Sequence, residues 1–205
     1  MCFSAQASIV AGLGLISIGS LTLKNMKRQD QLYLKLIPFL FGIQQLCEAI
    51  VWVTIYDEHS QLMAIGKYGF LFFAFVVWPL YVPLAVLYHE KEEKRRRWLS
   101  FFSGIGAVIS LKLAWDMLCF PIEAVVSCNH IQYTIMYSTT EWLGVILYCI
   151  ATIVPFFVAK QRYMHWFGLA LLFSVVVSAF FYAVCFTSVW CFFAALLSFF
   201  IYKID

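Results

Sequence analysis

The charged stretch His89-Glu-Lys-Glu-Glu-Lys-Arg-Arg-Arg97 lies between two long apolar segments, residues 62–88 and 98–118. Each segment is long enough to cross a bilayer, which takes about 20 apolar residues in a helix. A helix makes every backbone hydrogen bond internally, so it is the form in which such a segment crosses lipid. The sequence therefore predicts two membrane-spanning helices that are joined by a basic loop.

Apolar segments of the same kind occupy most of the chain. Of the 205 residues, 63% are apolar and 12% are Asp, Glu, Lys or Arg, compared with about 25% charged residues in a soluble domain. We expect a single all-α transmembrane domain over residues 1–205 with seven spans, at residues 4–23, 31–55, 62–88, 98–118, 140–159, 164–183 and 185–202. The last two spans form a nearly unbroken apolar run, so six spans with one re-entrant segment is the alternative.

The basic residues indicate the orientation of these spans. Lys67 and Lys112 lie within predicted spans, and the other twelve of the fourteen Lys and Arg residues lie in or beside alternate connections. The positive-inside rule assigns those connections to the cytoplasm, with the N-terminus outside and the C-terminus inside. No basic residue precedes the first apolar segment, so we expect it to be a retained span and not a cleaved signal peptide. These features predict an integral protein of the plasma (inner) membrane.

The expected partners follow from the same pattern. Because the basic residues are spread over short loops, we expect them to face the headgroups of the lipid bilayer and expect no nucleic acid partner. The sequence leaves a homo-oligomer open.

The outer connection at residues 119–139 contains no Lys or Arg. Apolar and polar residues alternate in Ile131-Gln-Tyr-Thr-Ile-Met-Tyr137, which predicts a β-strand and, with residues 124–127, a short hairpin. Cys119 and Cys128 share this connection. They are candidates for a disulfide, because the outer side of the membrane permits oxidation.

Polar side chains gather in the outer halves of the spans. Placing a charge in the bilayer core costs at least about 2.5–3.5 kcal/mol, so such residues usually face the bundle interior and pair. We therefore expect a polar cluster that is open to the outer face, formed by Gln44, Gln45, Glu48, Lys112, Asp116 and Glu141. Lys112 is expected to face Glu48 or Asp116, with Asp116 and Glu141 at the outer rim.

Three hypotheses about function follow. The first is a site that binds or translocates a small polar solute or ion, with Glu48 as the protonatable group and Lys112 as its counter-ion or an anion ligand. The second is a membrane enzyme that uses the Cys2 thiol, or a metal held by Cys2 with carboxylates or His130, on a lipid or thiol substrate. The third is a scaffold without a site. The sequence has no metal or cofactor fingerprint, so metal content and cofactors stay open.

Two short stretches support a resemblance. The start Met1-Cys-Phe-Ser-Ala5 and the run Gln44-Gln-Leu-Cys-Glu-Ala-Ile-Val-Trp52 resemble a family of small multi-pass membrane proteins of unknown function, which open with Met-Cys, an aromatic residue and Ser or Asn. The resemblance implies a multi-pass membrane fold. It directs attention to Cys2, Gln45, Glu48 and Trp52 and implies no reaction.

Overall fold

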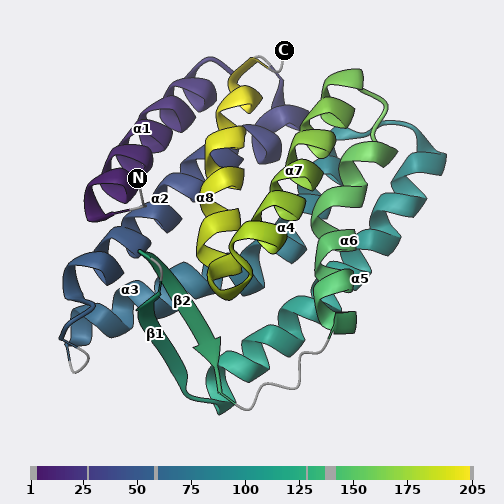
Figure 1. Cartoon of the computed structure of the whole chain (residues 1–205). Helices are drawn as coiled ribbons and strands as arrows, with labels where there is room; N and C mark the ends of the chain where they lie inside the picture. Colours follow the sequence, from purple (N-terminus) through teal and green to yellow (C-terminus); the bar gives the residue numbers. More distant parts are fainter. Residues whose placement is uncertain (1–3, 27, 58–59, 128, 137–141, 204–205) are drawn as a thin grey trace.

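The structure is a computed structural model that describes residues 4–26, 28–57, 60–127, 129–136 and 142–203 (Figure 1). Most of these residues are helical. The helices are α1 (Ala5–Lys24), α2 (Leu32–Thr54), α3 (Gln61–Leu71), α4 (Trp78–His89), α5 (Glu93–Cys119), α6 (Trp142–Val158), α7 (Arg162–Phe181) and α8 (Phe186–Ser198). A π-helical segment, Phe72–Val77, joins α3 to α4, so these two form one continuous helix.

Six of the described helices are long and apolar enough to cross a membrane, as the predicted all-α membrane domain requires. The exception is α6, whose apolar part, Leu143–Val158, is shorter. At 1.5 Å per residue this part is about 24 Å long, compared with about 30 Å for the hydrocarbon core of a bilayer. The predicted division between the last two spans is present, because α7 ends at Phe181 and a 3₁₀ turn at Ala183–Cys185 precedes α8.

A β-hairpin covers one end of the bundle, which we call the hairpin end (Figure 1). Strands β1 (Ile122–Ser127) and β2 (His130–Ile135) pair antiparallel, from Ile122 opposite Ile135 to Ser127 opposite His130. Asn129 in the turn has φ 61°, a left-handed conformation that asparagine tolerates better than most residues. The alternation in the sequence therefore appears as a strand whose Ile131 is buried against the bundle.

The π-helical segment brings a tryptophan into the centre of the bundle. Its carbonyl groups accept hydrogen bonds from neighbouring helices: Tyr148 donates to Ala74, and Ser110 donates to Val76 over 2.9 Å. Trp78 follows the segment directly and stacks on Phe41, with ring centroids 3.9 Å apart. A π-helical turn inside an α-helix is often found at a functional site.

The opposite end of the bundle, the basic end, carries the loop at residues 89–97, where the carboxylate of Glu90 joins two connections. Glu90 Oε1 accepts hydrogen bonds from the backbone amides of Lys91 (2.8 Å) and Glu92 (3.1 Å). Its Oε2 accepts from the backbone amide of Lys160, again over 2.8 Å. Glu90 thus joins the α4–α5 connection to the α6–α7 connection.

Burial raises the pKa of the Glu90 carboxyl, but the hydrogen bonds from these three amides outweigh it, so its pKa lies below the usual value. A lowered pKa in the folded state means that Glu90 stabilises the fold above the unfolded pKa of about 4.3 and loses this contribution as the pH falls through the folded pKa.

We expect Glu90→Gln to destabilise the protein at neutral pH by about 2 kcal/mol, because charge-assisted hydrogen bonds are lost. The difference from the wild type should shrink below pH 4, where the wild-type carboxyl becomes protonated. Thermal unfolding of both proteins across this pH range measures the effect. Glu93→Gln, at an exposed neighbour, is the control. A constant difference at all pH values would contradict this role.

Candidate functional site

Three polar side chains of α2 point into the bundle in the half nearer the hairpin. Gln44, Gln45 and Glu48 are all buried, and Glu48 is only 1% exposed. Gln44 and Glu48 are four residues apart, so they share one face of the helix. This face packs against α4 and α8.

Donors from two other spans complete the site. Trp78 Nε1 donates a 2.7 Å hydrogen bond to Gln44 Oε1, and Ser188 Oγ on α8 donates to Glu48 Oε1. We call these five residues the Glu48 cluster: Gln44, Gln45, Glu48, Trp78 and Ser188. It joins α2, α4 and α8 in the interior of the helical bundle.

Among the residues that the structure describes, every group close to the Glu48 carboxyl is neutral. Besides Ser188, it lies within electrostatic range of the Tyr133 hydroxyl and the Cys191 thiol. Across the residues that the structure describes, Glu48 forms no ion pair with a Lys or Arg. An isolated carboxylate in an apolar interior is strongly disfavoured, so this group needs either a proton or a cation.

Lys112 lies beside Asp116, one of its two expected partners. Its Nζ lies 2.6 Å from both carboxylate oxygens of Asp116, one turn further along α5. Helix α5 packs against α4, the π-helical segment and α6, whereas α2 packs against α1, α3, α4 and α8. Of the two predicted partners of Lys112, the structure has Asp116. Among the ion pairs of the described residues, none joins Lys112 to Glu48.

The remaining predicted site residues lie apart from the Glu48 cluster or outside the described part of the chain. Cys2, Cys128 and Glu141 belong to the second group. Cys119 is a free, exposed thiol, so the structure does not support the predicted disulfide. His130 stacks on Tyr182, with ring centroids 4.9 Å apart. Within the described ranges, no three His, Cys, Asp or Glu side chains form a group that could hold a metal ion.

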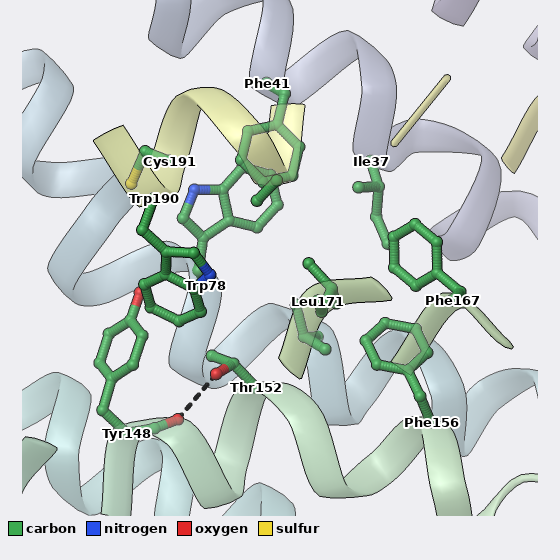
Figure 2. A pocket seen from close by; sticks show the side chains of 12 residues that line it. Ile37, Phe41, Trp78, Tyr148, Thr152, Phe156, Phe167, Leu171, Trp190 and Cys191 are labelled. Carbon is green, nitrogen blue, oxygen red and sulfur yellow. Dashed lines mark hydrogen bonds between the residues drawn. The ribbon is translucent and has the colours of Figure 1, made fainter. Parts of the chain in front are cut away.

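Two cavities lie beside the Glu48 cluster. One is an apolar pocket of about 40 Å³ in the centre of the bundle, where Trp78 and Trp190 face Phe156 and Leu171 (Figure 2). The other, which we call the hairpin hollow, is a cavity of about 290 Å³ between β2, the π-helical segment, α5, α6 and α8. Tyr148, Trp190 and Cys191 line both cavities.

Sequence reasoning missed Trp78, Tyr133, Ser188 and Trp190. Tyr133 carried a usable signal, because it lies between Ile131 and Ile135 on the inward side of an alternating strand. Ser188 lay in the predicted turn between the last two spans. Trp78 had no signal beyond its position in the middle of a span.

Comparison with known proteins gives a family and no activity. A family model described as "Family of unknown function (DUF6629)" matches residues 1–205. No curated protein and no solved structure matches the chain. Since the match covers the whole chain, the chain belongs to this family of unknown function.

Proposed function

We propose that this protein binds a small polar solute or ion at Glu48, inside the membrane, and that the ligand is positively charged. The observation that carries the proposal is a fully buried carboxyl group whose neighbours, among the described residues, are all neutral. A ligand cation would supply the charge that the described side chains do not supply. This arrangement is typical of substrate and ion pathways in membrane proteins.

The proposed topology has seven crossings, with the hairpin end outside and the basic end in the cytoplasm. The loop at residues 89–97 and the connections before α2 and α7 lie at the end opposite the hairpin (Figure 1). Their Lys and Arg residues support a cytoplasmic location. Helix α6 is short, but a bilayer accommodates a short span by local thinning at modest cost. The Glu48 cluster then lies in the outer half of the membrane.

Binding at this site has a chemical signature. Because the empty site disfavours a bare carboxylate, Glu48 holds a proton until a cation arrives. The cation then replaces the proton, which leaves for the solution, so that the site stays electrically neutral. Coupling of this kind allows a protein to exchange protons for a cationic solute.

Proton release measures this exchange. Purified protein in nanodiscs is placed in weakly buffered solution with a pH indicator, and sodium, potassium, methylammonium or phenethylammonium chloride is added. We expect at least one of these cations to release about one proton per protein molecule. Glu48→Gln should release none, and Glu123→Gln, at an exposed hairpin residue, should behave as the wild type. Equal release from the wild type and Glu48→Gln, or no release by any cation, would overturn the proposal.

A further inference from the structure

The hairpin hollow has the size and lining of a small-ligand site. Its volume of about 290 Å³ lies near the lower end of the range for ligand pockets, about 300–1,000 Å³. Most of its lining is apolar, and it includes the aromatic side chains of Phe75, Tyr133, Tyr148, Phe186 and Trp190. A hollow of this volume suits a molecule with one ring or a short alkyl body and is too small for a diacyl lipid.

Two polar atoms at the hollow have no hydrogen-bond partner among the described residues. The Tyr133 hydroxyl and Trp190 Nε1 are both buried and unsatisfied within the described structure, and Trp190 is only 7% exposed. Buried polar groups are rarely left unpaired, because each costs about 1–3 kcal/mol. Unpaired groups at the wall of a cavity therefore indicate a missing partner.

Two residues that line the hairpin hollow also lie close to the carboxyl group of Glu48. Tyr133 and Cys191 line the hollow, and both lie within electrostatic range of Glu48. Tyr133 is held in place by its ring, which stacks on Phe70 at a centroid distance of 4.9 Å. Its hydroxyl can accept a hydrogen bond from a ligand in the hollow, and the Glu48 carboxyl lies within electrostatic range of that hydroxyl.

We propose that the ligand is an organic ammonium ion with an apolar body, and that the body occupies the hairpin hollow. This inference rests on the proposed function and specifies its substrate class. The ammonium group donates a hydrogen bond to Tyr133 Oη and is held by the negative charge of Glu48. The aromatic rings of the lining favour a cation through their π faces and bury its apolar substituents. The proton of Glu48 passes to the solution, and no covalent bond is made or broken.

The proton-release assay tests the substrate class by comparing ammonium ions with and without an apolar body. Phenethylammonium should act at concentrations at least tenfold lower than methylammonium, because burying its ring is worth more than about 1.4 kcal/mol. The neutral analogue 2-phenylethanol should release no proton. Nanodiscs without protein correct for partition of the probes into lipid.

Two variants separate this inference from the proposed function. Tyr133→Phe keeps the stacked ring and removes the hydroxyl, so it should weaken the phenethylammonium response about tenfold. Cys149→Phe places a ring in the hollow and should abolish the advantage of phenethylammonium over methylammonium. Equal potency of the two ammonium ions in the wild type, or an unchanged response of both variants, would overturn the proposed substrate class. In either case, proton release by small cations would still support Glu48 as the binding group. Loss of all release from the wild type would overturn both.

Discussion

Glu48→Gln should stabilise the folded protein, although it removes the proposed binding group. Glutamine has nearly the same shape as glutamic acid, and its side-chain oxygen can still accept the hydrogen bond from Ser188. Glutamine is neutral without a proton, so the cost of protonating Glu48 when the chain folds disappears. This cost is present at every pH above the unfolded pKa of about 4.3, where the carboxyl of the unfolded chain is ionised. We expect a higher midpoint of thermal unfolding in the absence of ligand.

Glu90 provides the matched comparison for this prediction. Both carboxyl groups are buried, but Glu90 accepts hydrogen bonds from three backbone amides whereas Glu48 accepts one from a serine. The same substitution should therefore destabilise the protein at Glu90 and stabilise it at Glu48. A residue kept for function at the expense of stability is expected to behave as Glu48 does. A lower unfolding midpoint for Glu48→Gln would show that the carboxyl is part of the structural framework.

The chain order and the two ends of the bundle could be predicted from the sequence, because they depend on segment length and charge. The run at residues 89–97 can lie only between spans, and the alternation around Tyr133 is typical of a strand. The turn between the last two spans was predicted at residues 185–188, whereas the break lies at residues 182–185 and α8 begins at Phe186. These signals depend only on residues that are close together in the chain, so a single sequence is enough to detect them.

The side of each helix that faces the bundle interior could not be predicted in the same way. In a membrane both lipid and protein surroundings are apolar, so hydropathy does not distinguish the two faces of a span. Glu48 and Lys112 were placed at similar depth, but α2 and α5 lie in different parts of the bundle and Lys112 pairs within its own helix. The π-helical segment changes the direction of Trp78, and no pattern in residues 72–77 indicated it.

Gly106→Ala should disturb folding more than the substitutions at Glu48 and Glu90. A Cβ atom at Gly106 would lie 1.9 Å from the carbonyl oxygen of Pro79 and 3.4 Å from Cγ of Pro83. The first of these atoms belongs to the backbone of α4, so it cannot move aside as a flexible side chain could. The two helices would have to separate, and the packing of α5 against α4 and the π-helical segment would be lost.

The close approach at Gly106 follows from the two prolines. In a regular helix the backbone N–H of residue 83 would donate to the carbonyl of residue 79, but Pro83 has no N–H. The Pro79 carbonyl therefore lacks its usual hydrogen bond within the helix. The Cα hydrogens of Gly106 on α5 can approach this carbonyl, because Cα–H groups form weak hydrogen bonds to carbonyl oxygens. Any side chain at residue 106 would remove this contact and create a clash.

Gly104 is the control for this prediction, because a Cβ atom there would meet nothing within 4 Å. Gly104→Ala should be neutral or stabilising by up to about 1 kcal/mol, since alanine favours the helix. Gly106→Ala, in the same helix, should be destabilising by about 3 kcal/mol or more, given that ordinary overpacking costs about 1–3 kcal/mol. The yield of folded protein and the midpoint of thermal unfolding measure both changes. If the two variants unfolded at the same temperature, the close contact between α4 and α5 would not exist. The placement of Trp78, which precedes Pro79 on α4, against Gln44 at the proposed site would then be contradicted as well.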